Sequence, residues 1–75
     1  MYHTIEFASD FVIDLDVSTT NRTEQMRVRK GTRFEALLVP YVVEAGPCPV
    51  EVADLYMQTG SVMRMVPFGF FFFVD

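Results

Sequence analysis

Apolar and polar residues alternate with a period of two along most of this chain. Residues 11–17 read Phe-Val-Ile-Asp-Leu-Asp-Val, so Asp14 and Asp16 face away from the apolar odd-numbered positions. This period is typical of a half-buried β-strand. Comparable segments, separated by loop and turn residues, predict strands at residues 2–8, 11–17, 23–30, 33–44, 50–57, 62–66 and 70–74.

The segments 11–17 and 23–30 are suited to form one hairpin. With paired residue numbers summing to 43, apolar side chains face apolar ones and acids face bases, which favours cross-strand packing. The predicted pairs are Val17–Met26, Leu15–Val28, Asp16–Arg27 and Asp14–Arg29. A shift by two residues keeps part of this match, so the pattern leaves the register open.

A proline lies within the long segment 33–44. Pro40 has no N–H group to donate to a neighbouring strand, so the strand must be bent, bulged or at a sheet edge there. A long bent strand is what small closed barrels use to turn a corner.

Residues 50–58 are open to two interpretations. Pro49 before them and Gly60 after them could delimit a short helix, whereas the β-branched and aromatic residues within them favour a strand. As a strand, this segment forms a hairpin with residues 62–66 in which paired numbers sum to 120. Leu55 then faces Met65, Met57 faces Met63, and Thr59-Gly60-Ser61 forms the loop.

We therefore expect a single small domain, residues 1–75, of the all-β class. The strands form an antiparallel meander that closes into a small barrel or a strongly curved sheet. The bent strand at Pro40 and the last hairpin resemble the SH3-like class of small barrels in architecture. The alternative is an α+β fold with a short helix at about 50–58.

Composition restricts the kind of protein. Of 75 residues, 51% are hydrophobic, and ten acids against six bases give a net charge of −4. The longest uncharged apolar runs fall short of the ~20 residues of a membrane helix. Residues 1–20 contain no Lys or Arg, so we expect no secretory signal. With Cys48 as the only cysteine, no internal disulfide can form, which fits a cytoplasmic protein.

The charges are segregated along the chain. Residues 1–21 carry a net −4, residues 22–33 a net +4, and residues 34–75 a net −4. The basic patch could bind phosphate groups, but we expect it to be neutralised by the acidic strand, which makes nucleic-acid binding improbable. Imitation of a nucleic acid by the acidic surface is a weaker alternative. The patch consists of Arg27, Arg29, Lys30 and Arg33.

The residue pattern contains no recognisable catalytic constellation. His3 is the only histidine, and only Cys48 or a serine could act as a nucleophile beside it. Asp14 and Asp16 lack the spaced oxygen ligands of a calcium loop. We expect no enzyme activity, no metal site and no cofactor.

The phenylalanine-rich C-terminus is the strongest functional signal. Four consecutive phenylalanines place large rings on both faces of a strand, and outward rings mark an interface. We expect Phe71 and Phe73 to point outward with Phe70 and Phe72 inward, or the reverse, and the outward rings to be buried in a homo-oligomer. The predicted interface comprises Phe70, Phe71, Phe72, Phe73 and Val74.

The predicted function is a non-enzymatic protein-interaction or regulatory module that self-associates through this strand. A second hypothesis is a barrel that binds a small molecule in a pocket lined by aromatic, methionine and arginine side chains. The residues proposed for that ligand or partner surface are Tyr41, Tyr56, Met63 and Arg64.

Overall fold

The computed structural model describes residues 1–17 and 22–75, and within them it is built from antiparallel strands. Between the predicted strands 11–17 and 23–30, residues 18–21 lie outside the described residues. The elements are β1 (His3–Phe7), β2 (Phe11–Val17), β3 (Arg22–Val28), β4 (Arg33–Ala45), β5 (Cys48–Met57), β6 (Val62–Pro67), the short 3-10 turn η1 (Phe68–Phe70) and β7 (Phe71–Phe73).

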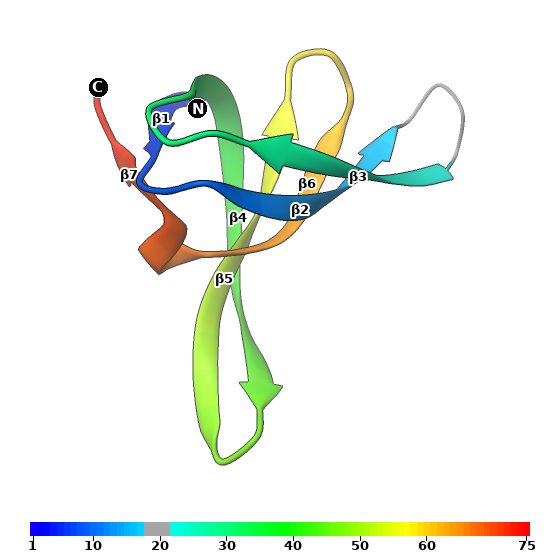
Figure 1. Ribbon diagram of the computed structural model, residues 1–75, viewed down its shortest axis with the longest axis vertical. Coiled ribbons are helices and arrows are strands. Elements are labelled where there is room, and N and C mark those ends of the chain that lie inside the picture. Colours follow the sequence, from blue (N-terminus) through cyan, green and yellow to red (C-terminus); the bar gives the residue numbers. More distant parts are fainter. Residues whose placement is uncertain (18–21) are drawn as a thin grey trace.

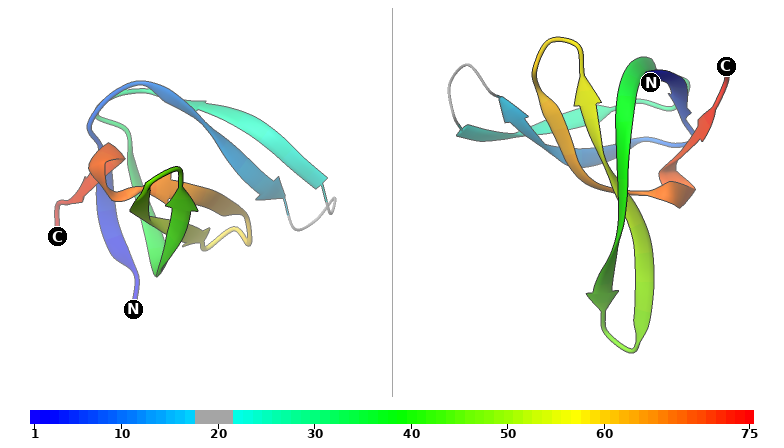
Figure 2. Two further views of the ribbon diagram at one scale, coloured as in Figure 1. Left: turned by 90° about the horizontal axis from the view of Figure 1, so that it is seen from below. Right: turned by 180° about the vertical axis from the view of Figure 1, so that it is seen from behind.

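The strands form one sheet in the order β3-β2-β6-β5-β4-β1-β7. This sheet curls into an open half-barrel whose two edges are β3 and β7 (Figures 1 and 2). The all-β prediction and the strongly curved sheet are thus confirmed. The predicted meander is wrong, because β1 pairs with β4 and β7 and β2 pairs with β6, so consecutive strands are not always neighbours. Among the described residues there is no helix long and apolar enough to cross a membrane.

The core fills the concave side of the sheet. Alternation sends every second side chain inward, so strands far apart in sequence contribute to one apolar cluster. Its members share near-complete loss of solvent contact, and Phe7 at its centre packs edge-on against three other rings. The cluster comprises Ile5, Phe7, Ile13, Val28, Ala36, Ala53, Leu55, Met63, Val66 and Phe71.

The hairpin of β2 and β3 forms, but its predicted register is wrong. Paired residue numbers sum to 39, so Ile13 faces Met26 and Asp16 faces Thr23. The observed register keeps the same residues on the core face, because it differs from the prediction by an even number of residues. It also extends the ladder to Val17–Arg22, which pairs all seven residues of each strand. Alternation alone cannot distinguish these two registers.

Residues 50–58 belong to a strand, so the helix alternative is wrong. The hairpin of β5 with β6 contains a β-bulge that the predicted register lacks. Leu55 pairs with Met63, while Ala53 pairs with Val66. Two residues of β6, Arg64 and Met65, therefore oppose the single residue Asp54.

Pro40 lies where the outer edge of β4 has no neighbour. β1 pairs with β4 only from Arg33 to Ala36, so beyond Ala36 the strand pairs on one side alone. Of the alternatives predicted for Pro40, a bend, a bulge or a sheet edge, the edge position is observed.

The distal part of the β4–β5 hairpin projects from the body of the molecule. We call residues 42–51 the arm, because Val52 is the first residue of β5 that pairs with β6. The arm ends in the tight turn Gly46-Pro47, in which Gly46 has a φ of 67°. Positive φ at the first central residue is the conformation that a II′ hairpin turn assigns to glycine. Figure 1 shows the arm as the lower end of the molecule.

Candidate functional site

The edge strand β7 is the part of the predicted interface that is open to a partner. β7 pairs with β1 through Phe71–Phe7, Phe72–Glu6 and Phe73–Ile5. Ala8 donates to the Phe70 carbonyl (2.9 Å), and Val74 donates to the Thr4 carbonyl (3.0 Å).

The hydrogen-bonding direction alternates along this strand. Because residues 70 and 74 direct their main-chain groups towards β1, those of Phe71 and Phe73 point to the opposite edge. Strand order leaves that edge of the sheet unpaired. β7 therefore presents both main-chain groups and aromatic rings to a neighbour.

The rings of the tail divide between core and surface. Phe72 is 46% exposed and Phe73 49% exposed, whereas Phe71 is 6% exposed and belongs to the core cluster. Phe71 and Phe73 share the inner face, but Phe73 lies where the half-barrel is open. The ring of His3 covers part of Phe73, with centroids 5.1 Å apart.

Two predictions about the tail need correction. An interface that buries Phe71 is wrong, because Phe68 and Phe7 already cover its ring inside the protein. Phe70 belongs to the 3-10 turn and not to the strand, and its ring packs on Phe11 at 4.4 Å. The exposed aromatic surface consists of Phe70, Phe72 and Phe73.

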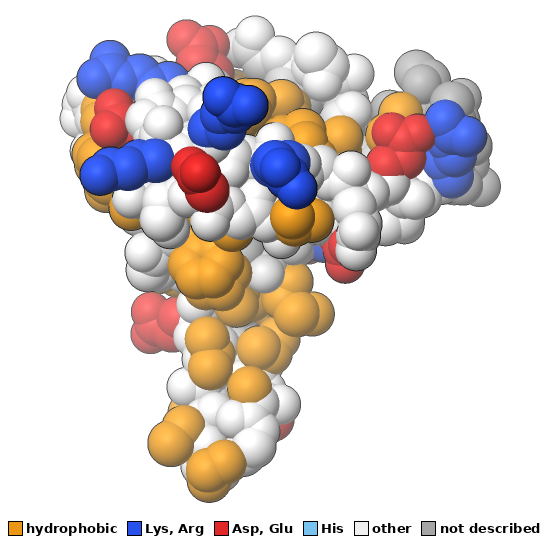
Figure 3. Space-filling model, viewed as in Figure 1, with side chains coloured by type: hydrophobic (Ala, Val, Ile, Leu, Met, Phe, Trp, Pro, Cys, Tyr) orange, Lys and Arg blue, Asp and Glu red, His pale blue; other side chains and the backbone are white. Residues whose placement is uncertain are grey.

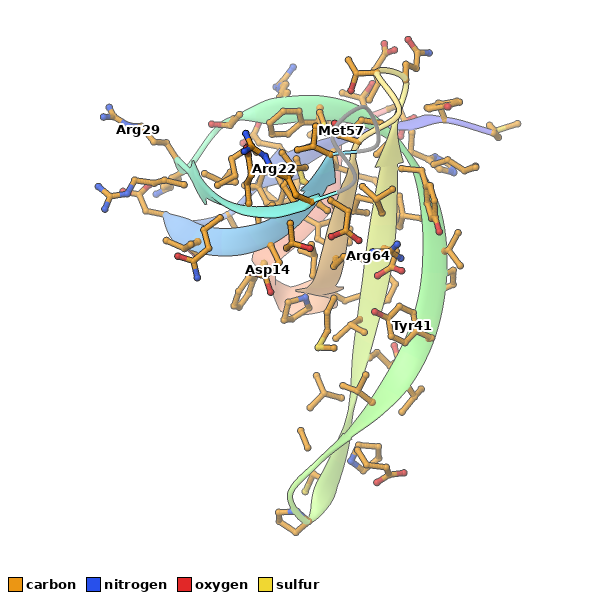
Figure 4. All side chains as sticks on the ribbon, turned by 90° about the vertical axis from the view of Figure 1, so that its right-hand side faces the viewer. Asp14, Arg22, Arg29, Tyr41, Met57 and Arg64 are labelled. Carbon is orange, nitrogen blue, oxygen red and sulfur yellow. The ribbon has the colours of Figure 1, made fainter. Side chains whose placement is uncertain are left out.

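A polar cluster centred on Asp54 forms a second candidate site, on the outer side of β5. The Tyr41 hydroxyl donates to Asp54 Oδ1 (2.8 Å), and the Met65 main-chain N–H donates to the same oxygen (3.0 Å). Arg64 donates to Asp54 Oδ2 (2.8 Å). The β-bulge creates this arrangement, since it brings the Met65 N–H and the Arg64 side chain to one carboxylate. Figure 4 shows Tyr41 and Arg64 over the same stretch of β5.

Arg64 connects this cluster to β2. Its Nε donates to Asp16 Oδ2 (2.5 Å), and the Thr23 hydroxyl donates to Asp16 Oδ1 (2.7 Å). The predicted partner of Asp16 was Arg27. In the structure its partner is Arg64 of β6, which is far from β2 in the sequence but lies next to it in the sheet.

These contacts shift the pKa values of the cluster. Burial alone would raise the pKa of Asp54, but hydrogen bonds from Met65, Tyr41 and Arg64 lower it below its usual range. Hydrogen bonds from Thr23 and Arg64 lower the pKa of Asp16. Partial burial and the Asp54 carboxylate raise the pKa of Tyr41. The carboxylates therefore stay ionised beside Arg64 at neutral pH.

The cluster has little spare capacity to bind a ligand. Arg64 contacts two carboxylates, so its charge is compensated, and the Asp54 side chain already accepts three hydrogen bonds. A hollow of about 300 Å³ beside it, between β2, β3 and β6, is lined in part by Arg22 and Arg64. The arrangement is suited to stabilise the bulge and the β2–β6 contact.

The predicted small-molecule surface is only partly assembled. Tyr41 and Arg64 meet through Asp54, as described above. Met63 is fully buried in the core, so it cannot line a surface, and Tyr56 pairs with Val62 further along β5. Asp54, which the sequence analysis did not single out, holds the other two together. The sequence feature that could have indicated Asp54 is its position as a single acid within the otherwise apolar residues 52–57.

The basic patch is exposed but is not neutralised as predicted. Arg27 pairs across from Val12, and Arg33 forms an ion pair with Glu6 (2.9 Å). Within residues 1–17 and 22–75, the side chains of Arg27, Arg29 and Lys30 form no ion pair, although the Lys30 main-chain N–H donates to Asp10 Oδ1 (2.6 Å). Figure 3 shows Lys and Arg side chains gathered on the body, at the end opposite to the arm.

His3 and Cys48 are not brought together. His3 lies on β1 with its Nδ1 3.4 Å from the Asp75 carboxylate, whereas Cys48 is exposed at the tip of the arm. In the described part of the chain, no three His, Cys, Asp or Glu side chains are grouped closely enough to hold a metal ion.

Comparison of the chain with protein-family models, with curated proteins and with solved structures found no match.

Proposed function

We propose that this protein is a non-enzymatic interaction module that self-associates through β7. The observation that carries the proposal is the free edge of β7, where outward main-chain groups lie beside the exposed rings of Phe72 and Phe73. Two copies of this edge can pair as antiparallel strands about a two-fold axis. Each Phe ring that becomes buried contributes roughly 1.5–3 kcal/mol.

The rings are tested by the double substitution Phe72→Ser and Phe73→Ser. At about 0.5 M salt, where charge contacts are screened, we expect the unmodified protein to sediment as a dimer and the variant as a folded monomer. Val39→Ser is the matched control, because Val39 is 44% exposed on β4, outside β7. A monomeric unmodified protein at high concentration would overturn the proposal.

The main-chain part of the proposal has a separate test at Phe73. Phe73→Pro removes an N–H group that points to the free edge, whereas Phe73→Ala removes only the ring. We expect the proline variant to dimerise more weakly than the alanine variant, while both retain the β-sheet circular dichroism spectrum. Equal dimer affinities would show that β7 does not pair through its edge.

Two finer expectations belong to the same proposal. The bent β4 strand at Pro40 supports an SH3-like class of barrel, and the exposed unpaired thiol of Cys48 supports a reducing, cytoplasmic location. Fractionation of cells that express the tagged protein tests the location. Recovery of the protein outside the cytoplasm would contradict it.

A further inference from the structure

The arm, residues 42–51, is a second surface without a partner in the molecule. The two strands of the arm pair only with each other. The pairing of β6 with β5 ends at Val52, and the pairing of β1 with β4 ends at Ala36. A two-stranded ribbon alone in water is marginally stable. Val42 is nevertheless 57% exposed and Val50 37% exposed. Figure 3 shows apolar side chains over most of the arm.

The two faces of the arm differ in polarity. Cross-strand partners share a face, so the register places Val43 with Val50 and Ala45 with Cys48 on one side. That face is entirely apolar. The opposite face carries the pairs Val42–Glu51 and Glu44–Pro49, and both of its charges are negative.

The charge of the arm indicates the partner that it fits. From Phe34 to Met63 the chain contains no Lys or Arg, so Glu44 and Glu51 have no basic neighbour within the hairpin. The acidic face of the arm also carries Val42, which is 57% exposed. The surface that complements this face is therefore basic and offers an apolar contact beside its charges.

The molecule itself carries such a surface, on its other free edge. β3 and the turn after it expose Arg27, Arg29 and Lys30, which have no ion-pair partner among the described residues. Val12, which pairs with Arg27, adds an exposed apolar side chain there. Figure 4 shows Arg29 extending away from the body.

In Figure 1 the arm projects downward from the body and β3 crosses the upper part of the body, so the arm and this basic surface are separated within one copy. A two-fold axis perpendicular to the long axis brings each arm to the basic end of the other copy. We propose that the arm of one copy docks on the basic β3 surface of a second copy, and reciprocally. This contact uses surfaces different from β7, so it is independent of the function proposed above.

The charges are tested by reversing and then exchanging them. The Phe72→Ser, Phe73→Ser protein serves as background, so that the β7 contact is absent. At about 20 mM salt, where screening is weak, we expect this protein to form a dimer that dissociates as salt is raised. Either Glu44→Lys with Glu51→Lys or Arg27→Glu with Arg29→Glu should weaken the dimer about tenfold or more.

The combined fourfold charge exchange should restore the affinity, because opposite charges again face each other. Glu35→Lys is the matched control, since Glu35 is an exposed acid of β4 outside the arm. Circular dichroism confirms folding of each variant. If the reversals leave the dimer unchanged, or if the exchange fails to restore it, the proposed contact is wrong.

Cys48 provides a direct test of position. The exposed thiol at the tip of the arm is labelled with a photoactivatable crosslinker and mixed with a nitrogen-15 copy carrying Cys48→Ser. We expect crosslinked peptides to come from residues 22–33 of the heavy copy, as read by mass spectrometry. Crosslinks confined to residues 71–75, or scattered over the surface, would overturn the assignment.

Discussion

At the scale of single residues, Asp54 has the greatest effect on local structure. One buried carboxylate accepts hydrogen bonds from β4, from the main chain of β6 and from Arg64, which in turn binds β2. The sequence indicated that Tyr41 and Arg64 belong to one surface, but it did not indicate the acid between them. The missing information was the bulge, because without it the Met65 N–H would not face Asp54.

Replacing Asp54 by Asn should lower the free energy of unfolding by about 1–3 kcal/mol, since charge-assisted hydrogen bonds are lost. Urea denaturation measures the effect. Glu35→Gln, which neutralises an exposed acid on β4, should change the stability little. An equal loss in both variants would contradict the role given to Asp54.

Stability should also depend on pH in the acidic range. Asp54 and Asp16 have lowered pKa values in the folded state, so the stabilisation is complete above their ordinary pKa and is lost as pH falls through the lowered values. We expect the melting temperature to decrease as the pH is lowered below about 4. The fall should be shallower in the Asp54→Asn variant, and equal slopes would argue against this linkage.

At the scale of elements, strand identity was predictable and strand register was not. The predicted strands 11–17 and 62–66 have observed counterparts in Phe11–Val17 and Val62–Pro67. Both hairpin registers were wrong. In β2–β3 the longer ladder decided the register, and in β5–β6 the bulge decided it.

The bulge places Met65 in the left-handed region, with φ at 53°. This conformation costs a non-glycine residue roughly 1–2 kcal/mol, and it is least accessible to β-branched side chains. Met65 is 55% exposed, so its side chain adds little packing. We expect Met65→Gly to be as stable as the original protein and Met65→Val to be less stable by about 1 kcal/mol. If thermal denaturation shows Met65→Val to be more stable than Met65→Gly, the backbone at Met65 is not strained.

The division of the phenylalanine tail has its own test. Phe71→Ala opens a cavity in the core and should destabilise the monomer by about 3–5 kcal/mol. Phe72→Ala should leave monomer stability nearly unchanged, because that ring is half exposed. Denaturation at low protein concentration separates folding from association, and similar losses in both variants would be inconsistent with the division.

At the scale of the whole molecule, the half-barrel leaves two free edges and one projecting arm. Apolar area and charge are distributed unevenly over these features: the aromatic rings lie at β7, the unpaired bases at β3 and the apolar, acidic surface on the arm. The run of phenylalanines in the sequence predicted outward apolar rings in the last residues. In the fold, exposed apolar side chains lie on both the tail and the arm.

Because the arm lies outside the core, it should be removable without loss of the fold. Replacing residues 43–50 by Asn-Gly closes the hairpin between Val42 and Glu51 with a favourable two-residue turn. We expect the free energy of unfolding to change by about 1 kcal/mol or less, since no core side chain is removed. If this variant no longer unfolds cooperatively, the arm stabilises the sheet and the expectation is wrong.

The sequence by itself determined the class of fold, the position of most strands and the irregularity of the long strand at Pro40. It could do so because alternation and the missing proline N–H act locally. Only the tertiary structure decided the registers, the bulge at Arg64 and Met65, and the burial of Phe71. A shift by two residues leaves an alternating pattern unchanged, so pairing depends on distant partners such as Asp54 and Asp16. The arm was likewise decided by the tertiary structure, because its exposure depends on where pairing with β1 and β6 ends.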